Sequence, residues 1–161
     1  MILGNQVEWT LHCMSVLSWF PEDVAVPSKL LAEFHGVRKD YLLKALQRLA
    51  GAGIVVTTTG PKGGYRLAKS PEEISLLEII EAVEGRQSSF HCQEIRKNNP
   101  CNKTTGQKSP VCSIAAVMYK ADHAWRDVLK KTKLSDVIRD VNATVPQKSL
   151  AESKEWFLER I

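Results

Sequence analysis

The segment from Tyr41 to Leu67 constrains the fold of this chain more than any other. Its first part repeats leucine at the spacing of a helix with one buried stripe. The β-branched run from Ile54 to Thr59 predicts a strand, and Tyr65–Leu67 predicts its antiparallel partner. The turn between them contains three glycines and a proline, which favour a tight reversal because glycine accepts positive φ and proline fixes its own φ. The segment therefore predicts a helix followed by a β-hairpin.

A shorter helical run precedes this segment. Residues 26–34 predict a helix that Gly36 ends, and a brief turn separates it from the helix that contains Tyr41. Two helices joined in this way form a helix-turn-helix, whose second helix enters the DNA major groove. A hairpin and a helix pair that merely pack together would give the same pattern.

Charge favours the DNA-binding interpretation. Residues 38–69 contain seven lysines and arginines against one acid, Asp40, which leaves a net charge of +6, whereas the whole chain carries +4. Such a concentrated basic patch suits contact with phosphate, since an ordinary solvated surface mixes its signs. We therefore predict a DNA-binding surface made of Arg38, Lys39, Tyr41, Lys44, Arg48, Lys62, Gly63 and Gly64.

The segments after the hairpin alternate between regular and irregular patterns. Ser75 to Glu78 form a capping-box pattern that opens a helix ending at Gly85. Residues 86–113 predict a long irregular loop, which in a compact protein is usually functional or disordered. Residues 136–141 and 149–161 predict short amphipathic helices, with Trp156 and Phe157 packing back on the protein.

A long apolar helix follows the irregular loop. Apolar residues recur at helical spacing from Ile114 to Leu129, over about four turns. This stripe is long for a helix that packs only on a small winged domain, so we predict a homodimer seam, with a plain core helix as the alternative.

The fold class that follows is mainly α with a small β-wing. We predict a winged helix-turn-helix DNA-binding domain at 1–85, a cysteine-bearing loop at 86–113, and a dimerisation helix with C-terminal helices at 114–161. The sequence shows no signal peptide and no run of eighteen apolar residues, so we expect a cytoplasmic protein with no membrane partner. Its four cysteines are then not expected to form structural disulfides.

A set of possible metal ligands lies outside the DNA-binding pattern. Cys92, Cys101 and Cys112 lie in the irregular loop, and Glu8 and His12 are four residues apart on the first helix, so they face the same side. The loop lacks the closely spaced cysteine pair typical of zinc sites, whereas an iron–sulfur centre accepts widely spaced thiolates.

Each of these residues also has a simpler interpretation. The helix dipole favours Glu8 in a first turn, and a lone histidine such as His12 is more often a surface or core residue than a ligand. Cys13 is expected to be a small buried residue. The loop cysteines could be thiol sensors that oxidise without any metal.

Four motifs together resemble a known family of regulators. They are Tyr41-Leu-x-Lys-x-Leu-Gln-x-Leu with Ala-Gly-Ile-Val, Gly60-Pro-x-Gly-Gly-Tyr-x-Leu67, Pro71-x-x-Ile-x-Leu-x-x-Ile-x-x-Ala-Val-Glu-Gly85, and the spaced cysteines. The chain resembles, over nearly its whole length, the winged-helix regulators of the Rrf2 type, which include IscR, NsrR and RsrR. Residues 7–13, 90–96 and 112–115 are most similar to the redox regulators of the RsrR type.

The resemblance implies a transcriptional regulator, expected to be a repressor and not an enzyme, that binds double-stranded DNA. It implies a [2Fe-2S] cluster at a homodimer interface, held by Cys92 and Cys112 of one subunit and by Glu8 and His12 of the other. The redox state or the presence of the cluster would control operator affinity. Trp9 is a possible switch, on the ground only that it is adjacent to Glu8.

The chain departs from the family pattern in two places. The cysteines are spaced more widely than in IscR-like members, so Cys101 is either a spare thiol or a third ligand of an alternative [4Fe-4S] cluster. Arg38 precedes the second helix, where relatives often have the better N-cap serine. The alternatives in function are a cluster-free thiol switch and an iron–sulfur electron-transfer protein or enzyme.

Overall fold

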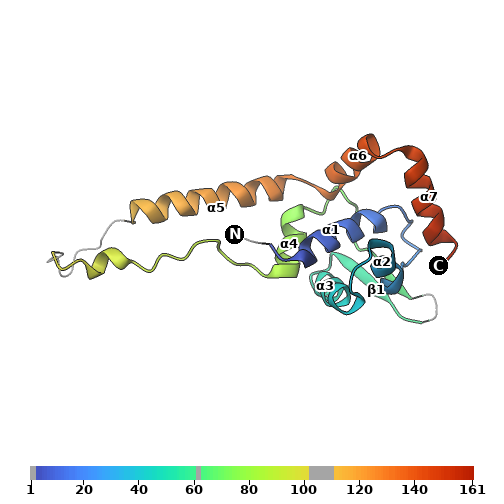
Figure 1. Cartoon of the computed structure of the whole chain (residues 1–161), viewed down its shortest axis with the longest axis horizontal. Coiled ribbons are helices and arrows are strands. Elements are labelled where there is room, and N and C mark those ends of the chain that lie inside the picture. The colour runs from blue at the N-terminus through green and yellow to red at the C-terminus, as the bar shows by residue number, and fades with distance from the viewer. Residues whose placement is uncertain (1–2, 61–62, 102–110) are drawn as a thin grey trace.

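A helical domain at one end of the molecule carries a long arm that projects to the other end (Figure 1). This computed structural model describes residues 3–60, 63–101 and 111–161. The predicted fold class is confirmed: the described residues are mostly helical, with one two-stranded antiparallel sheet. The helices are α1 (Asn5–Leu17), α2 (Ser28–His35), α3 (Lys39–Gly51), α4 (Leu76–Glu84), α5 (Ser113–Lys131), α6 (Leu134–Thr144) and α7 (Gln147–Leu158).

The core of the domain lies between α1, α3 and α4, which pack on one another. From α3, the side chains of Leu42, Leu46 and Leu49 are fully buried, as the leucine spacing predicts. Helix α1 contributes Met14, and α4 contributes Ile79, both also fully buried. Because one face of α3 is buried along its whole length, the opposite face is left to solvent.

Helices α2 and α3 form the predicted helix-turn-helix. Gly36 ends α2 in the left-handed conformation, with φ of 62°, and its backbone N–H bonds back to the helix. Arg38 is the N-cap of α3 and makes no side-chain capping bond, as expected for an arginine at that position. The turn between the helices is thus fixed by glycine and by backbone bonds.

The wing is a hairpin of β1 (Val55–Thr58) and β2 (Gly64–Leu67), in the predicted place. The sequence did not predict its third member: Val26, just before α2, forms a bridge to Tyr65, with N···O distances of 2.8 and 2.9 Å. This bridge ties the wing to the start of the helix-turn-helix.

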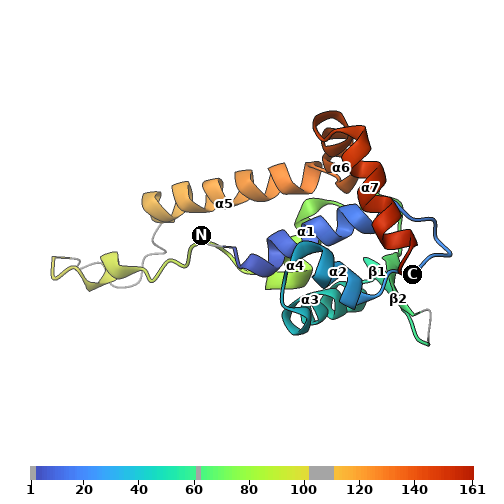
Figure 2. The same ribbon diagram turned by 45° about the vertical axis from the view of Figure 1, so that its right-hand side comes forward.

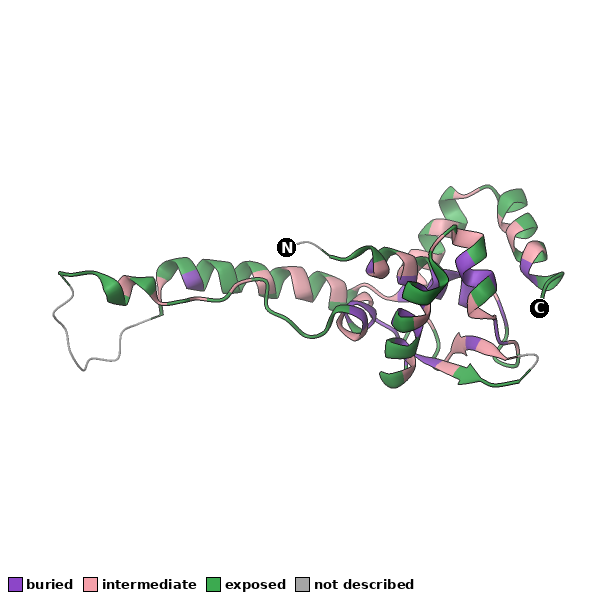
Figure 3. Ribbon diagram, turned by 60° about the horizontal axis from the view of Figure 1, so that its bottom comes forward, coloured by how far each residue is buried: buried purple, intermediate pink, exposed green. Residues whose placement is uncertain are grey.

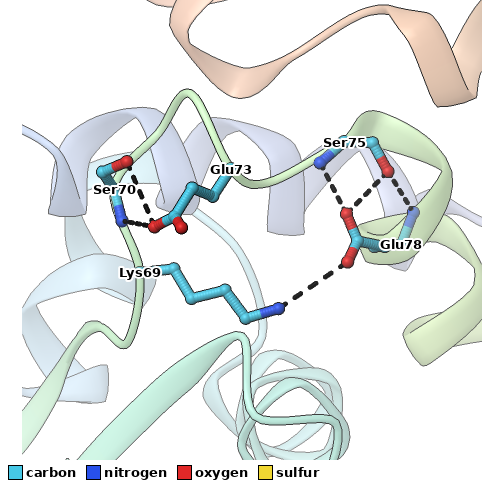
Figure 4. A network of polar contacts seen from close by, with 5 residues as sticks. All are labelled: Lys69, Ser70, Glu73, Ser75 and Glu78. Atoms are coloured by element: carbon cyan, nitrogen blue, oxygen red, sulfur yellow. Dashed lines mark hydrogen bonds and ion pairs between the residues drawn. The ribbon is translucent and has the colours of Figure 1, made fainter.

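The capping box at the start of α4 is confirmed (Figure 4). The Glu78 amide donates to the Ser75 hydroxyl at 3.2 Å, and the Ser75 amide donates to the Glu78 carboxylate at 2.8 Å. Lys69 lies 3.7 Å from the same carboxylate. These hydrogen bonds and the nearby ammonium lower the pKa of Glu78, overcoming the opposite effect of burial.

The arm consists of α5 and the segment 86–101, which run side by side (Figures 1 and 3). Phe90 packs edge-on against Tyr119, and the Ser89 amide donates to Asp122 at 3.1 Å. The prediction of an irregular loop at 86–113 was wrong for one stretch, since Ile95–Asn98 form a 3-10 turn. Most of α5 is exposed, and Ala115 is its one fully buried residue.

Helices α6 and α7 fold back over the domain (Figure 2). Both are longer at their N-terminal ends than the sequence pattern predicts. Phe157 of α7 is fully buried, with ring centroids of Trp19, Phe20 and Phe34 at 6.3, 5.9 and 4.8 Å. The expectation that Trp156 and Phe157 pack back on the protein is confirmed.

We expect Phe157→Ala to lower the free energy of unfolding by about 3–5 kcal/mol, because it leaves a cavity among three aromatic rings. The neighbouring Leu158 is 57% exposed, so Leu158→Ala is a matched control that should change stability by less than about 0.5 kcal/mol. Chemical denaturation of both variants measures the difference. Equal, small effects would show that α7 does not hold the core.

Candidate functional site

A cationic cluster lies on the solvent-exposed face of α3, near its start. The guanidinium of Arg38 lies 4.7 Å from the ring centroid of Tyr41, and the ammonium of Lys44 lies 5.8 Å from it. All three residues are exposed, as is Lys39 beside them. The quadrupole of an aromatic ring attracts a cation above its face, which holds these two cationic groups beside Tyr41. The structure thus brings together four of the predicted DNA-binding residues.

Arg48 is exposed like these four, but it differs from them in having a hydrogen-bond partner in another helix. Its Nη1 donates a hydrogen bond of 2.6 Å to the backbone carbonyl of Val83 in α4. Its guanidinium is therefore bound to the protein itself, although charge alone placed it in the DNA-binding patch.

The two wing glycines are required by close packing. A Cβ on Gly63 would lie 2.4 Å from the Thr58 carbonyl oxygen, and one on Gly64 would lie 2.4 Å from that of Val26. Contacts this short are not tolerated with backbone atoms, so both positions need glycine for the hairpin to form beside Val26. Lys62, the remaining predicted contact, lies outside the described residues.

A second candidate site is a cavity of about 560 Å³ in the arm. Cys92 and Cys112, twenty residues apart in sequence, both line it, together with Phe90, Glu94, Arg96 and Ile114. The Cys92 sulfur lies 3.6 Å from the Glu94 carboxylate, which in turn accepts two hydrogen bonds from Arg96, at 3.2 and 3.3 Å. Glu94 holds this place with a positive φ of 53°, unusual for a residue that is not glycine.

The Glu94–Arg96 pair was missed by the sequence analysis. In the sequence the pair is visible only as two opposite charges, two and four residues after Cys92. These charges point to a site only when the fold brings Cys112 into the same cavity. The guanidinium of Arg96 supplies positive charge where thiolates would form.

The position of Cys112 at the N-cap of α5 affects its acidity. The backbone N–H groups of Ala115 and Ile114 point at its sulfur and hold the pKa of the thiol below its usual value, with a smaller contribution from Arg96. Thiolate is the form of cysteine that binds metals. Two thiols in a largely apolar cavity, one favoured as thiolate, therefore suit one half of an iron–sulfur site.

Cys101 lies apart from this pair. It is exposed, it does not line the cavity, and its backbone amide donates to the Asn99 side chain at 2.9 Å. The structure therefore does not bring the alternative third cysteine ligand into contact with the other two.

Glu8 and His12 lie on α1, within the helical domain, and neither lines the cysteine cavity. Both are exposed on the same side of the helix, and the His12 ring lies 5.7 Å from that of His35. Among the described residues of a single chain, no group of three or more histidines, cysteines or carboxylates is placed to hold a metal ion.

The neighbours of this pair on α1 point inward. Trp9 is half-buried and packs against the core. Cys13 is fully buried, and burial raises the pKa of its thiol to about 12, in line with the prediction that it is a small core residue.

Comparison with known proteins gives a consistent result. The model of the family described as "Rrf2: Iron-dependent Transcriptional regulator" matches residues 3–140. The chain is 31% identical over 138 residues to the HTH-type transcriptional regulator NsrR of Bacillus licheniformis, covering 86% of this chain and 92% of that protein.

Solved structures show the same architecture. The chain is similar to IscR of T. potens, with a TM-score of 0.67 at 22% identity, covering 94% of this chain and 96% of the other. It is also similar to Staphylococcus aureus CymR, with a TM-score of 0.63 at 26% identity, covering 84% and 96%. In the described parts of the chain, no helix has the length and apolar character needed to cross a membrane.

We expect Cys112 and Cys13 to differ sharply in reactivity toward iodoacetamide in the reduced, metal-free protein near neutral pH. The lowered pKa of Cys112 gives it a larger thiolate fraction, whereas burial and a raised pKa protect Cys13. Mass spectrometry of peptides over time measures both rates. Urea-unfolded protein is the control, in which the two should react alike. A Cys112 rate that is no higher in folded than in unfolded protein would contradict the helix-terminus effect.

Proposed function

We propose, from the premise that the chain belongs to the Rrf2 family of transcriptional regulators, that it is a repressor controlled by an iron–sulfur cluster. DNA binding is the activity of the family, and the related proteins are named as regulators rather than as enzymes. What we add is the cluster, which we propose to be [2Fe-2S], its ligands, and redox control of operator affinity. We place the protein in the cytoplasm, where it can reach its operator.

One observation carries the proposal: Cys92 and Cys112 line the same cavity although the irregular segment between them is long. A loop of this length does not bring two cysteines together by local geometry. Here the contacts of Phe90 and Ser89 with α5 do so, since they hold residues 86–101 along the helix that begins beside Cys112. A thiol sensor would use the same pair, so the remaining ligands distinguish the two functions.

Glu8 and His12 of a second subunit are the proposed remaining ligands. They are exposed, share one side of α1, and lie on a different part of the chain from the cysteine cavity. A site built from both pairs would need two subunits. This agrees with the finding that the described residues of one chain bring no three such ligands together. When bound, a cluster with one histidine ligand supplies a one-electron couple at a higher potential than an all-cysteine cluster.

The surface that would join the subunits is the exposed apolar seam of α5. The structure divides the predicted stripe: Trp125 and Leu129 pack against the protein's own core, whereas another set stays exposed. That set repeats at alternating spacings of three and four residues, as in a coiled-coil seam. It consists of Ile114, Val117, Ala121 and Val128 from the predicted stripe, together with Ala124. Met118, also in that stripe, is exposed beside the seam.

The proposed division of the chain is by function, and its parts are not separately folded domains. Residues 1–85 bind DNA, 86–113 carry the cysteines, and 114–161 begin with the dimerisation helix. Leu134 and Phe157, from the last part, are buried in the core of the DNA-binding domain.

The proposed DNA contacts are the cationic cluster of α3 and the wing. Arg38, Lys39, Tyr41 and Lys44 would enter the major groove, and the turn at Gly63 and Gly64 would bring the wing near the backbone or minor groove. Trp9, next to Glu8 and packed on the core, is the proposed element that passes a change at the cluster to this surface.

The second candidate function is a cluster-free thiol switch at Cys92 and Cys112. The lowered pKa of Cys112 favours it, because the thiolate is the form that oxidises. A solved structure of S. aureus CymR, 25% identical to this chain, is described as an oxidised form. Metal content separates this function from the first.

We expect Val117→Asp to release monomers, because it would bury an unpaired carboxylate in the apolar seam. Ala116→Asp is the matched control, since it adds the same charge to the same helix at an exposed position off the seam. Sedimentation of both variants measures the oligomeric state. A dimer that persists in Val117→Asp with native stability would place the interface elsewhere.

The cluster hypothesis predicts about two irons and two sulfides per subunit in anaerobically purified protein. Cys92→Ala and Cys112→Ala should lose them, whereas Cys101→Ala and Cys13→Ala should keep them. His12→Ala should make the cluster labile, and His12→Cys should keep it at a lower potential. Iron and sulfide analysis, a spectroscopic redox titration and a DNA mobility assay measure these effects.

Three results would contradict this assignment. Four irons, absent from Cys101→Ala, would favour [4Fe-4S]. An unchanged spectrum and potential in His12→Ala would remove His12 from the site. Absence of iron, with DNA binding that still responds to oxidants through Cys92 and Cys112, would establish the thiol switch instead.

A further inference from the structure

The C-terminal end of α4 holds two other helices by polar contacts. Arg48, in the last turns of α3, donates from Nη1 to the Val83 carbonyl at 2.6 Å. Glu84, the next residue, accepts a hydrogen bond of 3.1 Å from the backbone N–H of Gly4, the N-cap of α1. Helices α1 and α3 are therefore both attached to one point on α4.

The contact with Arg48 satisfies a specific physical need. The last carbonyl groups of a helix have no partner within the helix and carry its negative dipole end. The residue Val83 is 1% exposed, whereas Glu84 and Gly85 after it are exposed, so this carbonyl lies at the edge of the core. A guanidinium from α3 is well suited to the place, because a charged donor makes a stronger hydrogen bond than a neutral one.

The contact with Glu84 is equally close. A Cβ on Gly4 would lie 2.7 Å from the Glu84 carboxylate oxygen, so glycine allows the carboxylate to lie against the start of α1. The negative charge at that place complements the positive dipole end of α1. Gly85 follows with φ of 84° and begins the segment that carries Cys92.

The start of α3, opposite the end that holds Arg48, contacts α1. The side-chain amide of Gln6 donates to the Tyr41 carbonyl at 3.4 Å, a longer and weaker bond than that of Arg48. The start of α3, which holds the cationic cluster, is thus fixed chiefly by packing. Its end is fixed by the Arg48 bond.

We infer that Arg48 is a positioning residue: by binding the end of α4 it sets the direction in which α3 presents Arg38 and Lys44 to DNA. This role replaces the direct phosphate contact that its charge predicts. The inference rests on DNA binding through α3 and does not require the cluster. The same end of α4 joins the cysteine-bearing segment to α3, so a displacement of that segment would act on α3 through Arg48.

The test compares Arg48→Met with Lys44→Met in the full-length protein. Binding is measured by fluorescence anisotropy against an operator selected from a random DNA pool and against an unrelated duplex, over a range of salt concentrations. Lys44→Met is the matched control, because it removes the same charge from an exposed residue of the same helix.

We expect Arg48→Met to weaken operator binding roughly threefold to thirtyfold while leaving non-specific affinity and the salt slope unchanged. Lys44→Met should weaken both affinities and reduce the slope of log K against log salt by about 0.9 for each phosphate that the protein no longer neutralises. A general loss of structure in Arg48→Met would instead weaken binding to the operator and to the unrelated duplex alike.

Arg48→Gln is a second neutral variant. Because its side chain is polar, it can replace Arg48→Met in the test if that variant folds poorly. A slope that falls in the Arg48 variants as it does in Lys44→Met would overturn the inference and make Arg48 a phosphate contact. Unchanged operator affinity in both folded variants would overturn it as well. Neither outcome affects the cluster hypothesis, which iron analysis tests separately.

Discussion

The burial of one face of α3 is the constraint on which the candidate DNA-binding surface depends. Leu42, Leu46 and Leu49 are fully buried between α1 and α4, so the helix cannot rotate without exposing its apolar face to water. This fixes the cationic cluster toward solvent, while the end of α3 is held in addition by the Arg48 bond to Val83. The hydrophobic face thus decides which side of α3 faces solvent. In the proposed role of Arg48, its polar contact sets the direction of the helix.

Local patterns were enough to predict the helix-turn-helix, the wing and the capping box, because leucine spacing, turn glycines and the Ser75–Glu78 pair each act over a few residues. They were not enough for the bridge between Val26 and Tyr65, which joins segments about forty residues apart. The starts of α6 and α7, at Leu134 and Gln147, were also missed. Those helices are held by tertiary burial, as at Leu134 and Phe157, more than by their own patterns.

The two candidate sites also depend on contacts between distant segments, which local patterns in the sequence do not reveal. Charge counting grouped Arg48 with Lys44, because a sequence does not reveal where a guanidinium finds its partner; the Val83 carbonyl lies in another helix. The sequence grouped Cys101 with Cys92 and Cys112, and only the family resemblance singled out the last two. Their shared cavity depends on the packing of Phe90 against Tyr119 across the arm. The predicted placement of Glu8 and His12 against the cysteines of another subunit stays a prediction.

The two proposed functions differ in where a signal would act. A disulfide or sulfenate at Cys92 and Cys112 would change only the arm, and it would reach the DNA-binding domain through α5 or through the end of α4. A cluster held also by Glu8 and His12 would join the arm of one subunit directly to α1 of the other. Since the start of α1 is bonded to Glu84 and α3 to Val83, the second route and one of the two paths of the first meet at the end of α4. A single joint of this kind would allow either proposed chemistry to act on α3, because a change in one small region would alter the direction of the helix without disturbing its buried face.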